Sequence, residues 1–152
     1  MALTVIRNMA GKVPVAPPKD NYPFEAESGT EPEAGKVYSY DGNNETLVEA
    51  ADAEDEAIVI AVDGADDGED FRGQYILPGM VYRADCAGTG EPTHIKEGVV
   101  GMQLNDAEEV KDSDDTDGPL TILRVYQSDH DDDTYYADVV FCKSAFAVTT
   151  SA

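Results

Sequence analysis

Basic residues, cysteines and long apolar runs are scarce in this sequence, and tryptophan is absent. It has only ten basic residues and two cysteines among 152. Without an apolar run of 18 residues, no segment is expected to cross a bilayer as a helix. The apolar stretch before Arg7 is too short for the core of a signal peptide, so we expect synthesis in the cytosol.

The shortage of basic residues excludes two classes of partner. Against the ten basic residues stand 32 acidic ones, which gives a formal net charge of −22. Binding to nucleic acid needs Lys and Arg to neutralise phosphates, so no nucleic-acid partner is expected, and an anionic membrane surface is disfavoured for the same reason. Such a charge raises solubility and opposes compaction unless salt or a partner relieves the repulsion.

The few cysteines and histidines do not form a pattern typical of a metal site. Cys86 and Cys142 each lie in a strand-like stretch, and we expect both to be buried thiols, with a disulfide between them left open. His94 and His130 lie in polar stretches that are typical of solvated loops. No nucleophile with a partner base and no zinc-ligand spacing occurs. The sequence therefore predicts no catalytic residue, cofactor or metal site, and it predicts a protein that is not an enzyme.

One acidic segment resembles the opening of a calcium loop. It runs from Asp112 to Gly118 as DSDDTDG. When Gly118 takes the sixth position of such a loop, Pro119 falls at the seventh and Arg124 replaces the bidentate Glu at the twelfth, which excludes an EF-hand. A solvated acidic loop is the favoured interpretation. Weak calcium binding here, or in the acidic loop at 129–133, stays open.

What the sequence does contain is a series of short β-prone stretches divided by Gly, Asp and Asn. Apolar residues make up 41% of the chain, enough for a folded core. Residues 36–40 and 46–48 flank the turn signal DGNN and predict a hairpin, although 45–56 would also suit a helix. Residues 57–62 predict a strand buried on both faces, and 80–86 alternate as a half-buried strand does. Further strands are expected at 75–77, 99–104, 120–126 and 135–146.

These signals predict an all-β fold. About seven or eight short antiparallel strands favour a small β-barrel or β-sandwich. Two stretches, GKVYSYD from Gly35 and GMVYRAD from Gly79, share Gly, Val, Tyr and Asp at equal offsets. We interpret them as two strands that follow similar glycine turns, with a duplicated half-barrel as the alternative.

The first 34 residues differ from the rest and predict an extended, Pro-rich arm ahead of a body at 35–152. Residues 1–36 carry four basic and five acidic residues, whereas the remaining 116 carry six and 27. Proline at this density is typical of an extended segment outside a central sheet. Such an arm gains stability by lying along another protein, so we predict partner-binding residues in it. They are the apolar Leu3, Val5 and Ile6, and the basic Arg7, Lys12 and Lys19. The alternative is a tail without a role.

From Ala34 to about Leu104 the pattern resembles the head decoration, or cement, proteins of tailed bacteriophages. The segments that carry the resemblance are GKVYSYDG, ETLVEAAD, AIVIAVDGA, ILPGMVYRAD and GVVGMQL. Members of that family are small β-barrels or β-sandwiches, commonly homotrimers, that bind the capsid exterior and bridge neighbouring major capsid protein subunits. The resemblance thus implies a structural virion protein, made in the host cytoplasm, which stabilises an assembled capsid and forms a homo-oligomer.

Two other classes compete with that expectation. An acidic, salt-adapted or calcium-binding β adhesion or binding module would also carry many exposed carboxylates, and tight calcium binding would distinguish it. A hydrolase of unfamiliar type would need a pocket with a carboxylate of raised pKa, because carboxylates in solvated loops keep ordinary pKa values.

Overall fold

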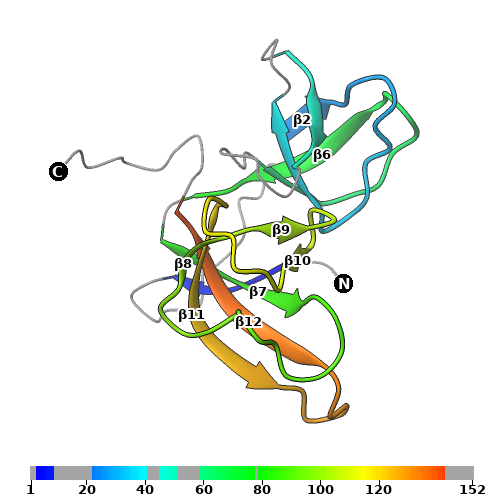
Figure 1. Cartoon of the computed structure of the whole chain (residues 1–152). Helices are drawn as coiled ribbons and strands as arrows, with labels where there is room; N and C mark the ends of the chain where they lie inside the picture. The colour runs from blue at the N-terminus through cyan, green and yellow to red at the C-terminus, as the bar shows by residue number, and fades with distance from the viewer. Residues whose placement is uncertain (1–2, 9–21, 41–44, 51–58, 78, 143–152) are drawn as a thin grey trace, which may run out of the picture.

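The computed structural model describes residues 3–8, 22–40, 45–50, 59–77 and 79–142, and these residues form two β-sheets (Figure 1). In these ranges there is no helix that could span a membrane. The all-β prediction is confirmed. The strands are β1 (Thr4–Asn8), β2 (Tyr22–Glu25), β3 (Val37–Tyr40), β4 (Leu47–Glu49), β5 (Val59–Ala61), β6 (Asp70–Tyr75), β7 (Met80–Cys86), β8 (Val100–Met102), β9 (Leu104–Asn105), β10 (Glu109–Val110), β11 (Leu120–Gln127) and β12 (Tyr135–Phe141).

The larger sheet is a nearly closed six-stranded barrel with a seventh strand attached. Its order is β8-β11-β12-β7-β10-β9, and β1 pairs with β7 outside this path. β8 and β9 lie at opposite ends of that order, yet only Gln103 separates them in the chain. Because one short stretch supplies both ends, the sheet closes on itself. All pairings are antiparallel except the parallel pair of β10 with β7.

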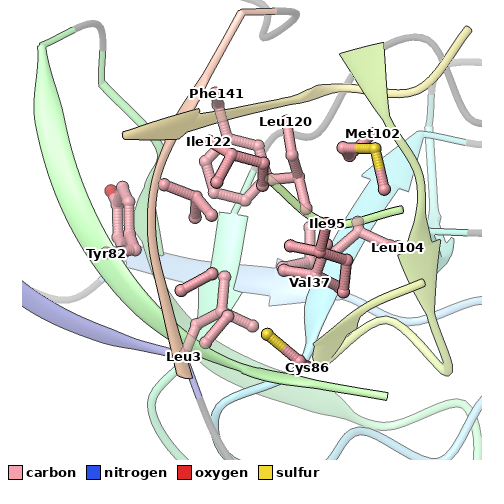
Figure 2. Packing of buried hydrophobic residues seen from close by; sticks show 14 of the residues in the cluster. Leu3, Val37, Tyr82, Cys86, Ile95, Met102, Leu104, Leu120, Ile122 and Phe141 are labelled. Atoms are coloured by element: carbon pink, nitrogen blue, oxygen red, sulfur yellow. The ribbon is translucent and has the colours of Figure 1, made fainter. Parts of the chain in front are cut away.

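Alternation along the strands fills the barrel with aliphatic side chains (Figure 2). On β7, Tyr82, Ala84 and Cys86 are buried in the core while Arg83 is exposed, as the sequence predicts. Val81 departs from the predicted alternation, because it is buried too. Tyr82 packs edge-on against Phe141 with ring centroids 5.4 Å apart. The other large buried side chains of this core include Leu3, Val37, Ile76, Ile95, Met102, Leu104, Val110, Leu120, Ile122 and Val139.

The smaller sheet has the order β2-β6-β5-β3-β4 and an aromatic core. Its two edge strands come together where Ala26, just after β2, forms a parallel bridge to Leu47 of β4. Phe71 lies between two other rings, with centroid distances of 6.1 Å to Phe24 and 5.0 Å to Tyr38. The hydroxyl of Tyr38 accepts a hydrogen bond of 2.8 Å from the backbone N–H of Glu33.

β3 joins the two sheets because its neighbouring side chains enter different cores. Tyr38 is buried in the aromatic core, whereas Val37 is buried in the barrel core, where Figure 2 shows it near Ile95 and Leu104. The backbone N–H of Val37 also donates to the carbonyl of Ala107, at 2.9 Å. Ala107 follows Asp106 in the tight turn between β9 and β10, and both residues have a positive φ. The barrel thus presents this turn to the smaller sheet.

Several predicted elements are confirmed and some are not. The hairpin is present as β3 and β4, so the helix alternative is wrong for the described residues 47–49, while 41–44 and 51–58 lie outside the described residues. The predicted strand at 57–62 appears as Val59–Ala61. β6 begins earlier than predicted: the expected strand at 75–77 shares only Tyr75 with the observed Asp70–Tyr75, and Asp70 itself was interpreted as loop. The similar stretches from Gly35 and Gly79 both follow a positive-φ glycine, but they lie in different sheets.

A correction concerns the amino-terminal arm. Its described residues take part in the sheets of their own chain, since β1 pairs with β7 and β2 pairs with β6. Edge pairing and the burial of a few side chains outweigh the signal from the prolines, most of which lie in residues 9–21, outside the described residues. The prediction placed this segment outside a central sheet, and β1 and β2 do lie at sheet edges, but at edges of their own chain.

Candidate partner-binding face

The structure describes only part of the predicted arm site. Leu3 is 6% exposed and belongs to the barrel core, so its side chain is not free in this arrangement. Val5 and Arg7 pair in register with Tyr82 and Val81 of β7, and a bulge falls between them at Ile6. The two lysines of the predicted site, 12 and 19, lie outside the described residues. Partner binding by these six residues stays a prediction.

Beside β1, the outside of the barrel carries a row of charges that runs across neighbouring strands. In register, Arg124 of β11 is opposite Asp138 of β12, and Asp138 is opposite Arg83 of β7. Arg83 is in turn opposite Thr4 of β1. Both arginines are exposed, whereas Asp138 is 5% exposed. Opposite positions on one face of a sheet lie within about 5.5 Å, so the row places two cations around one buried anion.

Tyr126 is the centre of this face. Its hydroxyl donates a 3.1 Å hydrogen bond to Oδ1 of Asp138. The guanidinium carbon of Arg83 lies 5.3 Å from the centre of the Tyr126 ring and that of Arg124 lies 5.1 Å from it, both within cation–π range. The ring of Tyr136 packs at a tilt, with its centroid 5.8 Å away. We call these five residues, Arg83, Arg124, Tyr126, Tyr136 and Asp138, the arginine–tyrosine face.

The electrostatics of the face reflect its partial burial. Burial raises the pKa of Tyr126, the Asp138 charge raises it further, and the positive charge of Arg83 opposes the shift. On the adjacent row, burial likewise raises the pKa of Asp85, with the nearby carboxylate of Glu109 acting in the same direction. The hydroxyl of Tyr126 therefore stays protonated at physiological pH. It donates a hydrogen bond to the buried carboxylate of Asp138, which is thus not left without a partner.

The two arginines differ from Lys36 and Arg72 in their partners. Lys36 forms ion pairs with Glu33 and Glu49, at 3.3 and 3.2 Å, and Arg72 pairs with Asp63. Arg83 and Arg124 instead contact the Tyr126 ring, and neither forms an ion pair with another described residue. In a chain with 32 acidic residues, acidic partners are abundant. The guanidinium groups of Arg83 and Arg124 lie over a ring instead of pairing with a carboxylate. They therefore remain available to carboxylates or carbonyls of another protein.

The calcium-like loop is organised by the protein itself. The carboxylate of Asp112 accepts hydrogen bonds from the backbone N–H groups of Thr93 and His94, at 3.0 and 2.7 Å. Asp117 accepts a hydrogen bond from the side-chain amide of Gln103, at the junction of β8 and β9. No group of three or more His, Cys, Asp or Glu side chains in the described ranges is arranged to bind a metal ion.

The histidines and cysteines divide into confirmed and corrected predictions. His94 and His130 are exposed in loops, as predicted. Cys86 is buried, and burial raises its pKa to about 12. The prediction that Cys142 is buried is wrong: β12 ends at Phe141, so Cys142 follows the strand and is exposed. Both thiols are free.

Sequence reasoning missed the arginine–tyrosine face, although a signal for it was present. The alternation along 80–86 already assigned Arg83 to the outside of the barrel. The same alternation along β12 places Tyr136 and Asp138 outside. What the sequence did not reveal is the strand order that brings β11, β12 and β7 side by side.

Comparison of the chain with protein-family models, with curated protein sequences and with solved structures found no match in any of the three.

Proposed function

We propose that this protein is a capsid decoration protein, a structural virion component that binds the outer surface of an assembled phage head and bridges major capsid protein subunits. The resemblance to that family supports the proposal, and its segments coincide with strands of the fold. They contain β3, β4, β5 and β8, and all of β7 except Cys86. The function is mechanical: a protein that binds only the assembled shell stabilises it by mass action, and many weak contacts add up across copies.

The observation that carries the proposal is the arginine–tyrosine face. Arginine and tyrosine are enriched among the residues that dominate binding energy at protein interfaces. Here two guanidinium groups are fixed over one ring, so less side-chain entropy is lost on binding than with free arginines. Because the two guanidinium groups lie over the Tyr126 ring and form no ion pair with another described residue, they favour a partner that offers carboxylates or backbone carbonyls. Lys12 and Lys19 of the leader would add contacts to the same shell.

Substitution is a sharper test than truncation of the leader. Deleting residues 1–24 would remove Leu3 from the barrel core and most of β2 from the smaller sheet, so loss of binding would not be specific. We therefore compare Arg83→Ala/Arg124→Ala with Arg72→Ala. Arg72 is also exposed but pairs with Asp63 on the other sheet, and its loss serves as the control for removing a cation.

The measurement is co-sedimentation with shells assembled from the cognate major capsid protein. Loss of two guanidinium contacts should weaken binding at least about tenfold, which corresponds to about 1.4 kcal/mol. The Arg72→Ala variant should bind as the unsubstituted protein does. The proposal is wrong if the unsubstituted protein does not sediment with the shells. Full occupancy by the double variant would reject the arginine–tyrosine face as the contact.

A further inference from the structure

β1 completes an edge of β7 that no other described strand covers. β12 covers one edge of β7 through residues 82–85. On the other edge, β10 reaches only Asp85 and Cys86, and β1 pairs with residues 80–83. Without β1, the backbone groups along this part of β7 would form an open strand edge, which readily pairs with another chain. We call residues 80–83, with the core site occupied by Leu3, the β1 slot.

β1 is attached to the slot by few kinds of contact. The backbone pairing with β7 is antiparallel and interrupted by a bulge between Val5 and Arg7. Leu3 anchors the strand by its side chain in the barrel core, and its N–H donates to the carbonyl of Gly35 at 3.3 Å. All of these contacts involve a terminal segment and a slot that is identical on every copy of the chain. A strand from a second copy can therefore make the same contacts.

The length of the connection permits such an exchange. Thirteen residues, 9–21, separate the end of β1 from the described residues that begin at β2. A chain of that length spans up to about 40 Å when extended. A compact domain of about 120 residues has a radius of gyration of about 14 Å. The leader is thus long enough to place β1 on a neighbouring body.

Charge attracts the leader to the body of a second copy as it does to its own. Through Pro23 the chain has three basic residues and one acidic residue, and from Phe24 onward it has seven basic and 31 acidic. Two bodies of that charge repel each other, whereas the leader of one is attracted to the body of the other. Arg7 lies within β1 itself, so the exchanged segment carries part of that attraction.

We propose that β1 is exchanged between copies, so that residues 3–8 of one chain occupy the β1 slot of another and link the copies into an oligomer. Exchange of an identical element preserves every contact seen within one chain and adds an interface at little cost. This proposal does not depend on capsid binding. The leader would connect copies, while four of the five residues of the arginine–tyrosine face lie on β11 and β12, and only Arg83 belongs to both the face and the slot.

Disulfide trapping identifies which chain supplies β1. Thr4 and Arg83 are directly opposite in an antiparallel pair, at a separation suited to a disulfide. One chain carries Thr4→Cys and another, of different mass, carries Arg83→Cys, both with Cys142→Ser. Cys86 stays in place because it is buried, and burial raises its pKa to about 12. The two chains are refolded together, oxidised, denatured and weighed without reductant.

Exchange predicts a disulfide-linked heterodimer of the two chains as the main product. The double variant Thr4→Cys/Arg83→Cys should likewise give covalent dimers or larger species. Thr121→Cys/Val140→Cys is the matched control, since these residues are opposite each other within the β11–β12 hairpin and should link inside one chain. Asn8→Cys/Met80→Cys repeats the test at the other end of β1.

Two results would overturn the proposal. If the double variants at both ends of β1 give only internally linked monomers, each chain fills its own slot. If the control links and neither β1 pair does, β1 does not occupy the slot of any chain.

Discussion

The barrel core and the core of the five-stranded sheet differ in the side chains that fill them. Among the described residues, two of the sixteen buried side chains of the barrel core are aromatic, against three of seven in the smaller core. Tyr75 adds a fourth ring to the smaller core, 5.3 Å from Phe24 and perpendicular to it. Each ring buries about 150–250 Å², so a few rings give a small sheet the apolar area that the barrel collects from many aliphatic residues.

The stability of the barrel depends instead on the close approach of two backbone segments at the place where the barrel closes. The N–H of Gly118 donates to the carbonyl of Gly101 at 2.7 Å, next to the junction of β8 and β9. A Cβ on Gly101 would overlap the backbone of Thr116, and a Cβ on Gly118 would overlap Met102 and Gln103. The comparison therefore predicts that the barrel is most sensitive to backbone crowding and the smaller sheet to the loss of rings.

Gly101→Ala should have the largest effect. The residue has φ of +91° and its added Cβ would meet the backbone of Thr116, which cannot yield without opening the barrel. We expect the free energy of unfolding to fall by more than about 3 kcal/mol, measured by urea denaturation. Gly88→Ala is the control, because Gly88 has φ of +88° with nothing within 4 Å of the added atom. That variant should lose only about 1–2 kcal/mol. Equal losses of unfolding free energy in the two variants would show that the backbone is not tightly packed where the barrel closes.

Phe71→Leu should have the next largest effect. The substitution removes ring contacts to Phe24 and Tyr38 and leaves a smaller apolar side chain, at a cost of about 1–3 kcal/mol. Phe141→Leu in the barrel is the matched control, since Phe141 packs on the ring of Tyr82 within a larger core. Hydrogen exchange should show lost protection along β3, β5 and β6 for the first variant. A greater loss from the barrel variant would contradict the comparison.

The sequence predicted strands best where their side chains alternate and a glycine turn precedes them. The strand at 80–86 and the β3–β4 hairpin are confirmed because local pattern and turn chemistry agree with the final fold. Most of β6 was missed because Asp70, Arg72 and Gly73 are poor strand residues in isolation. Gly73 fits there because the ring of Phe24 lies against it, 3.1 Å from where a Cβ would be. Such a contact between two strands leaves no local signal.

The candidate face was harder to predict than the fold. Its rows cross β11, β12 and β7, and their register depends on a bulge between Ile122 and Arg124 that moves Arg124 to the outside. Without that extra residue the alternation from Ile122 would place Arg124 toward the core. The arm, in contrast, was predicted too simply, since composition suggested an extended segment but could not show that β1 fits the edge of β7.

The smallest effect we predict tests the ordering of a barrel loop by a carboxylate. Asp112 is partly buried, which opposes its charged form, but the N–H groups of Thr93 and His94 outweigh burial and lower its pKa. Because the folded pKa lies below the unfolded value of about 3.9, this group stabilises the fold above that pH, and the contribution is lost as pH falls through the folded pKa. Asp112→Asn should therefore cost about 1 kcal/mol at pH 7, since solvent screens part of the interaction of a partly exposed carboxylate.

The pH dependence separates this contribution from a simple loss of packing. In urea denaturation, the difference between Asp112→Asn and the unsubstituted protein should begin to shrink below about pH 4, where the unfolded carboxylate takes up a proton, and should be lost once the pH falls below the lowered pKa of folded Asp112. Asp114→Asn removes a charge from the exposed part of the same loop and should change stability little at either pH. A penalty for Asp112→Asn that stays constant from pH 7 to pH 3 would mean that the carboxylate charge does not order the loop.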